Sequence, residues 1–453
     1  MKHPSFSHGK TLAGIALGIA LAPTGALAQF TALPEPAAYA LENVVVVQAD
    51  GSRTNGITIV VRNGLIEAMG PNVQAPPDAD VLEGDSLVVY PGFVDAQGAA
   101  KYEFPKPETD RSKIKSWAPP RSVQSFTPHQ RIVDYLSATG EDFADERKHG
   151  VVAEAVLPDG RLMPGRGTLL LLRKNAATAE ELVVRPTLGV SMSLQGARGV
   201  YPTQLFAVMA FIRQSFEDAR HEASVREAYD KDPRGMTTPK WDPDYAVLRE
   251  ALDGSARVYF NANNAEDIRN VLELAREYGF RPAIVGGAEA WMLADELKRN
   301  NVPVLVSLDF PKPQRWKPKK EKSDTAAAQA TEEELDPAAW REKKELEDRY
   351  ANPAHLAEAG VTFALTSGGG KAKLRDGARK AIEYGLSEDA ALAALSTAPA
   401  SLLGIPAVGR IAEGMAATFM VADGPLFDEG TSITYTFVEG RVERGESKKA
   451  AAD

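Results

Sequence analysis

Residues 256–306 read ARVYFNANNAEDIRNVLELAREYGFRPAIVGGAEAWMLADELKRNNVPVLV, and this stretch decides the class of fold. Its two ends and residues 282–285 are short apolar runs rich in β-branched residues, which is typical of strands buried on both faces. Between these runs, 265–278 and 288–299 place apolar residues at helical spacing. Strands that alternate with helices of this length predict βαβ units and a parallel sheet.

Further buried strands are predicted on both sides of this stretch. Residues 151–156 and 361–365 are further apolar runs that we expect to be buried strands. The whole region, 91–404, has the length of a (β/α)8 TIM-like barrel, so we predict an α/β fold with a closed barrel. Within it, 312–349 is dense in Lys and Glu and is predicted to be a solvated insertion, helical from 337 to 350; a partner-binding arm is the alternative.

The two ends of the chain have a strand-and-turn pattern instead. In 29–90, Asn63-Gly64 separates two β-rich runs, which is a strong signal for a β-hairpin. In 405–445, short apolar runs recur around a second tight-turn pair, Glu439-Gly440. We therefore predict a small β-sandwich formed by both chain ends.

The first 28 residues are typical of a secretory signal peptide. Lys2 and Lys10 precede an apolar run, 11–21, and the small-residue triplet at 26–28 follows it. We expect cleavage near Ala28 and a periplasmic or secreted protein. The apolar run is shorter than the roughly 20 residues of a membrane-spanning helix, so no membrane anchor is predicted.

Composition excludes several classes of partner and site. The chain of 453 residues has 62 acidic and 52 basic side chains, a formal net charge of −10, which argues against nucleic acid or anionic lipid as the main partner. It has no cysteine, so neither disulfides nor thiolate metal sites can form.

Four segments, in this order, resemble the amidohydrolase superfamily, and within it the imidazolonepropionase-like branch. Residues 60–70 resemble the hairpin of that family's sandwich, and 89–96 (VYPGFVDA) resemble the entry to its first barrel strand. Residues 385–405 are similar to its last barrel helix, and 409–414 (GRIAEG) to the return into the sandwich. The resemblance implies the barrel-plus-sandwich plan over nearly the whole chain.

The resemblance also implies a site for zinc or another divalent metal, but this chain lacks the histidines that would hold it. The family's Asp-x-His-x-His at the end of the first strand corresponds here to Asp95, Gln97 and Ala99. Two further family histidines, which follow later strands, correspond to Asn261 and Gly286. An amide oxygen is a weak neutral ligand, and Ala99 and Gly286 have no side-chain donor atom. No cofactor is therefore predicted.

The family's catalytic aspartate, which follows the eighth strand, corresponds to Ser367, or to Gly368 if the alignment shifts by one residue. In that mechanism the metal acidifies a bound water and the aspartate takes its proton. This chain lacks both the metal ligands and the aspartate at these positions, so neither step is expected. Ser367 with Lys371 as nucleophile and base is an alternative, although Ser and Lys beside glycines are common in loops. The histidines beyond the leader lack ligand spacing and are predicted to be surface or structural: His129, His149, His221 and His355.

We therefore expect a degenerate amidohydrolase, a pseudoenzyme that keeps the barrel and its mouth pocket without metal-dependent hydrolysis. It would bind a small ligand in that pocket or act as partner subunit to an active homologue. The alternative hypothesis is a hydrolase of C–N bonds, in cyclic or other non-peptide amides, that uses an unrecognised site. The candidate pocket residues are Asp95, Gln97, Asn261, Gly286 and Ser367.

Overall fold

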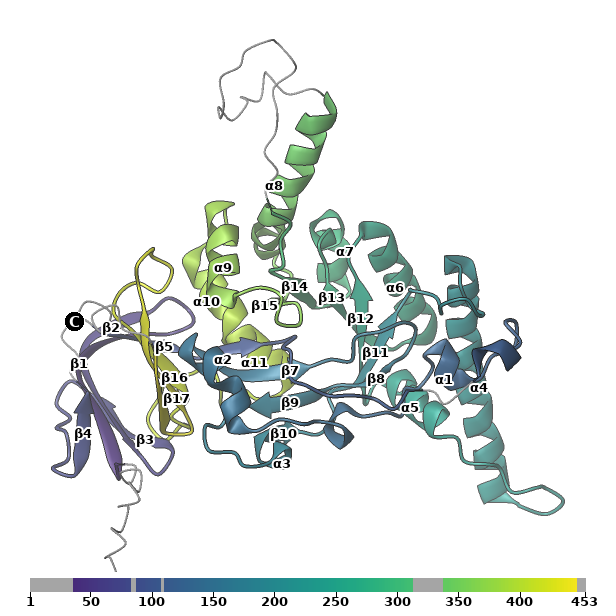
Figure 1. Ribbon diagram of the computed structural model, residues 1–453, viewed down its shortest axis with the longest axis horizontal. Helices are drawn as coiled ribbons and strands as arrows, with labels where there is room; N and C mark the ends of the chain where they lie inside the picture. The colour runs from purple at the N-terminus through teal and green to yellow at the C-terminus, as the bar shows by residue number, and fades with distance from the viewer. Residues whose placement is uncertain (1–35, 83–86, 107–109, 313–336, 446–453) are drawn as a thin grey trace, which may run out of the picture. The chain divides into compact units, whose positions relative to one another are not determined.

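The computed structural model describes residues 36–82, 87–106, 110–312 and 337–445. The predicted signal peptide and most of the charged insertion lie outside these residues. Among the described residues, no helix is long and apolar enough to cross a membrane. The part from Ala37 onward forms one compact unit, which is drawn in Figure 1.

A parallel sheet occupies the middle of this unit, as the stretch 256–306 predicts. Its strand order is β15-β14-β13-β12-β11-β8, with β8 (Gly165–Arg166) as an antiparallel edge. The other five strands run parallel to their neighbours: β11 (Val190–Ser193), β12 (Arg257–Ala262), β13 (Arg281–Gly286), β14 (Val304–Ser307) and β15 (Phe363–Thr366). Parallel pairing brings the carboxyl ends of these strands to one edge, where ligand sites form in α/β folds.

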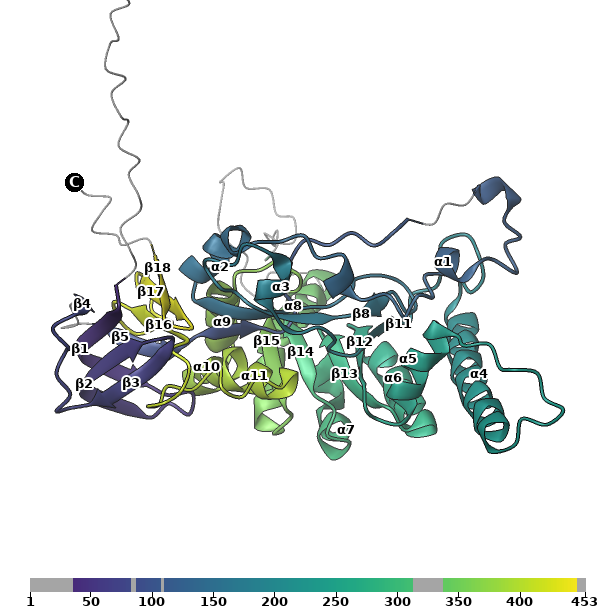
Figure 2. The same ribbon diagram turned by 90° about the horizontal axis from the view of Figure 1, so that it is seen from below.

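Helices connect these strands, and α6 (Ala265–Tyr278) has the predicted bounds. It begins where the Asn264 side chain accepts a hydrogen bond from the Asp267 amide, and it ends at Gly279, whose φ of 79° favours glycine. The predicted helix 288–299 begins later, as a 3₁₀ turn at Ala290–Leu293 followed by α7 (Ala294–Arg299). Figure 2 shows α6 and α7 beside β12 and β13.

In the described C-terminal part, one helix connects β14 to β15 and further helices follow β15. Helix α8 (Pro337–Glu358) begins at the predicted residue but continues past Tyr350, because Ala354 and Leu356 are buried. The next three helices are α9 (Leu374–Glu383), α10 (Glu388–Leu395) and α11 (Thr397–Leu403). In the part of the chain that the structure describes, five α-helices precede β12: α1 (Arg121–Gln124), α2 (Ala144–Lys148), α3 (Ala179–Leu182), α4 (Leu205–Lys231) and α5 (Pro243–Leu252).

A second sheet has the order β10-β9-β7-β6. Its strands are β6 (Phe93–Asp95), β7 (Val151–Val156), β9 (Thr168–Leu171) and β10 (Val183–Arg185), and only β6 and β7 are parallel. The described strands therefore form two separate sheets where a closed barrel was predicted, and neither sheet closes on itself. The prediction is confirmed as an α/β region with parallel strands and intervening helices.

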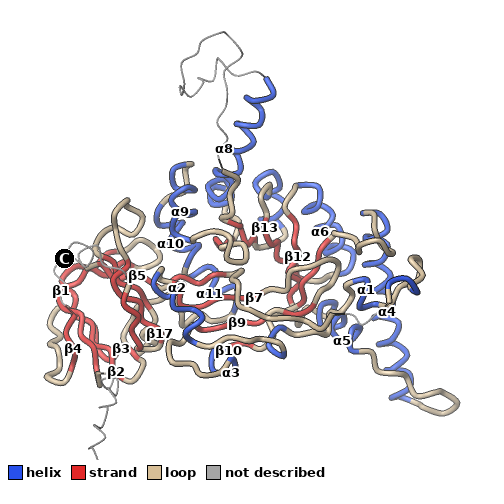
Figure 3. The backbone as a smooth tube through the Cα atoms, in the orientation of Figure 1, coloured by secondary structure: helices blue, strands red, loops and turns tan. Residues whose placement is uncertain are grey.

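Both chain ends join one eight-stranded sheet, of order β18-β17-β16-β5-β1-β2-β3 with β4 beside β1. The N-terminal strands are β1 (Ala38–Val47), β2 (Arg53–Arg62), β3 (Leu65–Gly70), β4 (Ala79–Leu82) and β5 (Val88–Pro91); the C-terminal strands are β16 (Phe419–Ala422), β17 (Ile433–Val438) and β18 (Arg441–Arg444). Antiparallel pairing of β5 with β16 joins the two ends, and Figure 3 shows this sheet as strands and loops with no long helix. The joining of the ends is observed, whereas a two-layer sandwich stays a prediction.

Both predicted tight turns are present in this sheet. Asn63 and Gly64 have φ of 51° and 82°, and Glu439 and Gly440 have φ of 47° and 78°. Two consecutive positive φ values are the requirement of a type I′ hairpin turn, which explains the glycine at each second position.

Candidate functional site

A cavity of about 320 Å³ lies at the carboxyl ends of β12, β13, β14 and β15. Three of the five candidate residues, Gln97, Asn261 and Gly286, line this mouth cavity together with Ser307 and Asp309. The shared edge of the parallel sheet brings Asn261 and Gly286 together, and Gln97 reaches the same cavity from the segment after β6 of the second sheet. Gln97 and Asn261 are half-buried. Among the described residues, no hydrogen bond is found for either side-chain amide.

Gly286 is required by its surroundings. Its φ is 95°, which L side chains rarely adopt, and a Cβ there would overlap Oδ1 of Asn263. A side chain at this position would therefore need the Asn263 amide to move aside. Asn263 was missed in the sequence analysis, although it stands two residues after Asn261 at the end of β12.

Asp95 and Ser367 lie together, but outside the mouth cavity. The Asp95 carboxylate accepts hydrogen bonds from the amides of Gln97 (3.0 Å) and Ser367 (3.1 Å). The Ser367 hydroxyl donates to the Gln97 carbonyl (3.0 Å) and accepts from the Gly370 amide (2.8 Å). These contacts join the segment after β15 to the segment after β6 and use the hydroxyl structurally.

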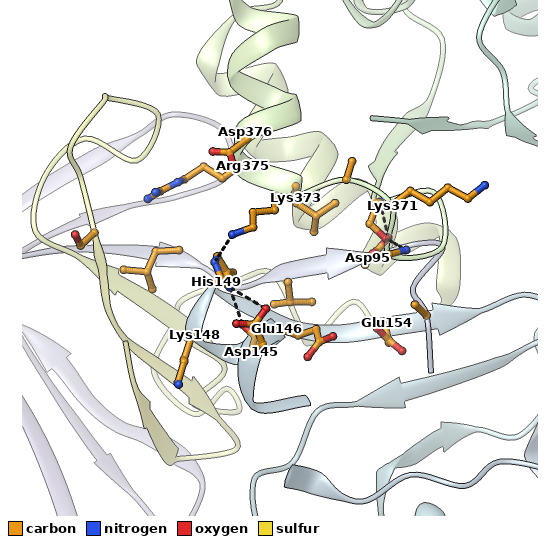
Figure 4. A pocket seen from close by; sticks show the side chains of 18 residues that line it. Asp95, Asp145, Glu146, Lys148, His149, Glu154, Lys371, Lys373, Arg375 and Asp376 are labelled. Carbon is orange, nitrogen blue, oxygen red and sulfur yellow. Dashed lines mark hydrogen bonds and ion pairs between the residues drawn. The ribbon is translucent and has the colours of Figure 1, made fainter. Parts of the chain in front are cut away.

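The hypothesis of Ser367 as a nucleophile with Lys371 as its base gains no support from this geometry. The Lys371 amide donates to the Ser367 carbonyl (3.1 Å), while its side chain extends away from Asp95 in Figure 4. A base must lie within hydrogen-bond reach of the hydroxyl that it deprotonates.

A second cavity, of about 680 Å³, lies beside the strands and contacts α2, β7, the segment before α9, and the start of β17. We call it the lateral cavity. Asp95, Ser367 and Ala99 line it, together with Glu146 and Glu154. Ala99 therefore lines a different cavity from Gln97, Asn261 and Gly286.

Glu154 is the most unusual residue of the lateral cavity. It pairs with Asp95 in the register of β6 and β7, and both side chains are buried, with 3% and 5% of their surface exposed. Its Oε1 accepts from the Ala100 amide (3.1 Å). Burial, and then the negative charges of Asp95 and Glu146, raise the pKa of Glu154 to about 8. Burial also raises the pKa of Asp95.

Glu154 was missed in the sequence analysis, although a signal exists. The run 151–156 reads VVAEAV, and a lone carboxylate in a strand buried along its whole length is rare without a function or a polar partner. His149, predicted to be structural, lines the same cavity and is bonded through Nδ1 to the Asp145 carbonyl (2.7 Å).

The residues present do not fit the metal that the resemblance implies. A catalytic zinc site needs three protein ligands, usually imidazole or carboxylate, with one open position. The mouth offers two amides and a glycine at the corresponding positions, and the glycine cannot be replaced without moving Asn263. Within the described ranges, no group of three or more His, Cys, Asp or Glu residues is placed to hold a metal ion.

Comparisons with known proteins identify the fold. No family model matches the chain, and no curated protein matches it. An amidohydrolase from Thermotoga maritima superposes with a TM-score of 0.70 and 22% identity, over 90% of this chain and 100% of the other. A putative prolidase from Bifidobacterium longum has a TM-score of 0.51 and 15% identity, over 92% and 97%. A prolidase complexed with N-methylphosphonate-L-proline has a TM-score of 0.50 and 15% identity, over 90% and 100%.

These similarities confirm the resemblance that the four sequence segments carry, at the level of the fold. At such identities they do not transfer an activity or a ligand, because function depends on the residues of the site. The chain has the fold of the amidohydrolases.

Proposed function

We propose that this chain is a degenerate amidohydrolase that binds a small polar ligand in the mouth cavity and does not carry out metal-dependent hydrolysis. The observation that carries the proposal is the composition of the strand ends around that cavity. Amide side chains, Gln97 and Asn261, and the crowded Gly286 stand where the resemblance implies imidazoles.

The proposal includes a barrel built from both central sheets. Apolar side chains from the two sheets share one core cluster, to which Val94 and Ala153 contribute from one sheet and Tyr259, Leu305 and Ala364 from the other. The Gly369 amide also donates to the Gln97 carbonyl (2.8 Å), between the segments that follow β15 and β6. A shared interior and contact between the first and last strands are what a closed barrel requires.

The chemistry of the mouth favours a neutral ligand with both donors and acceptors. The half-buried amides of Gln97 and Asn261 each offer an N–H donor and a carbonyl acceptor. The charged lining residues balance in sign: Arg349 is paired with Glu289 (Nη2 to Oε1, 3.7 Å), and Asp309 and Lys371 carry one charge of each sign. Cyclic amides such as hydantoin have the matching groups, and they serve as probes.

Saturation-transfer NMR with hydantoin tests the binding part of the proposal. We expect a signal with the wild type and its loss in Asn261→Ala, because the variant removes one of the two convergent amides. Asn300→Ala is the matched control, since Asn300 follows α7 and bonds locally to the Glu296 carbonyl (2.8 Å). Equal signals from the wild type and Asn261→Ala would overturn a mouth site.

Assays on cyclic amides and acyl-amino acids, with added zinc or manganese, test the loss of hydrolysis. We expect no turnover above that of the buffer with the same metal. Turnover that a chelator abolishes would support the alternative, a C–N hydrolase with an unrecognised site. The expected periplasmic location, and a role as partner to an active homologue, belong to the same proposal and are tested by cell fractionation and by co-purification with that homologue.

A further inference from the structure

The lateral cavity is distinct from the mouth cavity, and within the described part of the chain Lys371 is the only residue that lines both. Its volume of about 680 Å³ is within the range of small-molecule sites. The ligand site proposed for the mouth cavity does not depend on the lateral cavity. Its lining also has an uneven distribution of charge, which the contacts of the fold do not explain.

One wall of the lateral cavity carries three carboxyl groups, those of Asp95, Glu146 and Glu154. Asp95 and Glu154 are almost completely buried. Among the described residues no ion pair is found for any of the three. Oε2 of Glu146 is buried and has no hydrogen-bond partner in this structure. Buried polar atoms are normally satisfied, so an unsatisfied carboxylate oxygen beside a cavity points to a missing donor.

Glu154 is also repelled by the other two acids. The charges of Asp95 and Glu146 both contribute to raising the pKa of Glu154, after burial itself. Burial likewise raises the pKa of Glu146. A cation that entered the cavity would offset this repulsion and supply donors to the unsatisfied oxygen.

Another part of the lining carries positive charge. Nζ of Lys373 lies 3.4 Å from Nε2 of His149, and Nδ1 of His149 bonds to the Asp145 carbonyl. A carbonyl can only accept, so Nδ1 of His149 donates to the Asp145 carbonyl, and Nε2 is the atom that can accept a hydrogen bond from the Lys373 ammonium. This contact positions the Lys373 ammonium and leaves its other N–H groups available. Figure 4 shows Lys373 directed toward His149, with Glu146 and Glu154 farther along the cavity.

We propose that the lateral cavity binds a small zwitterion, with its ammonium group on the wall formed by Asp95, Glu146 and Glu154 and its carboxylate on Lys373. The two charged ends of the ligand match the two charged parts of the lining. The roughly equal mixture of polar and apolar groups in the lining, which includes Val151, Leu374 and Ile433, accommodates an aliphatic body between them.

Isothermal titration calorimetry with three probes of one shape tests the proposal. L-Leucine has both charged groups, isopentylamine has only the ammonium, and 4-methylpentanoate has only the carboxylate. We expect leucine to bind most tightly, isopentylamine to bind more weakly, and 4-methylpentanoate not to bind. Binding by none of the three, or equal binding by all three, would overturn the proposal.

Variants locate each contact. Glu146→Gln should weaken the binding of leucine and of isopentylamine by about tenfold, the effect of one hydrogen bond to a charged group. Lys373→Met should reduce leucine to the affinity of isopentylamine and leave isopentylamine unchanged. Glu141→Gln is the control, because Glu141 is an exposed acid in the preceding turn and does not line the cavity. Glu146→Gln keeps a side-chain acceptor and the shape of the side chain, and Lys373 is exposed, so folding should be preserved in both lining variants.

If Glu141→Gln weakens binding as much as Glu146→Gln does, the effect is one of overall charge and the site assignment is wrong. If the two lining variants leave leucine binding unchanged, leucine binds elsewhere and the proposal fails. The hydantoin measurement on the mouth cavity is unaffected by either outcome, so failure of this inference is distinguishable from failure of the proposed function.

Discussion

Glu154 makes the stability of this protein depend on pH in a direction unusual for an acid. Its pKa rises from 4.5 in the unfolded chain to about 8 in the folded protein. Between these values the folded state keeps a proton that the unfolded state has lost, so the free energy of unfolding falls as the pH rises through this window. The loss is complete above about pH 8.

Substitution of Glu154 by Gln should remove this dependence. Gln keeps the acceptor for the Ala100 amide and has no charge to bury. Urea unfolding between pH 5 and pH 9 measures this effect. As the pH rises, the free energy of unfolding of the variant should increase relative to that of the wild type by on the order of a few kcal/mol. The difference between the two proteins reports the burial of Glu154 together with its repulsion from Asp95 and Glu146, because Gln removes both. A constant difference across the series would contradict the burial argument.

Gly286 should tolerate even a methyl group poorly. Gly286→Ala combines a positive φ with overlap against Asn263, and should cost about 2 to 4 kcal/mol of unfolding free energy. Gly279→Ala is the matched control, because it has a φ of 79° but nothing within 4 Å, and should cost about 1 kcal/mol. Asn263→Ala should restore part of the unfolding free energy that Gly286→Ala loses, and none of that lost in Gly279→Ala. Equal costs at 286 and 279 would show that position 286 has room for a side chain.

At the scale of elements, the ion pair between Arg147 and Glu443 is one of several that join the sheet of the chain ends to the α/β region. Arg147 of α2 has only 1% of its side chain exposed, and it donates to Glu443 of β18 from Nε (3.1 Å) and Nη2 (2.9 Å). Its Nη1 donates to the Gly140 carbonyl (2.6 Å). Removal of the carboxylate would leave a buried guanidinium without its partner charge, which costs more than the pair itself contributes.

Glu443→Ala should therefore lower the free energy of unfolding by about 3 kcal/mol in urea denaturation. Glu429→Ala is the control, since Glu429 pairs with Arg379 but is 90% exposed, and it should cost less than about 1 kcal/mol. Comparable small effects in both variants would mean that α2 and β18 are held together by apolar packing instead.

The sequence predicts local elements well where a single periodicity dominates. Helix α6 has the predicted bounds, because its apolar face, its Asn264 cap and Gly279 all agree. The hairpin at Asn63-Gly64 is equally local. The late start of the helix after β13 depends on a long-range contact, in which Glu289 Oε2 accepts from the Ala265 amide (3.0 Å), and no local pattern reveals that.

At the scale of the whole molecule, the order of segments predicts the amidohydrolase fold, and the structure brings Gln97, Asn261 and Gly286 to one cavity. The resemblance does not predict that Asp95 and Ser367 would line a different cavity. Nor does it single out Glu154, because the pairing of β6 with β7 sets that contact. Positions taken from a motif indicate where a strand ends, whereas the direction of each side chain depends on neighbouring strands.

The central claim is that the mouth cavity does not hold a catalytic metal, and metal analysis of the purified, dialysed protein tests it most directly. Amide oxygens at positions 97 and 261 carry no formal charge and make only a partial site. The account predicts zinc and manganese far below one equivalent per chain, with no change in the Gln97→Ala and Asn261→Ala variants. One tightly held equivalent in the wild type that either variant loses would contradict it.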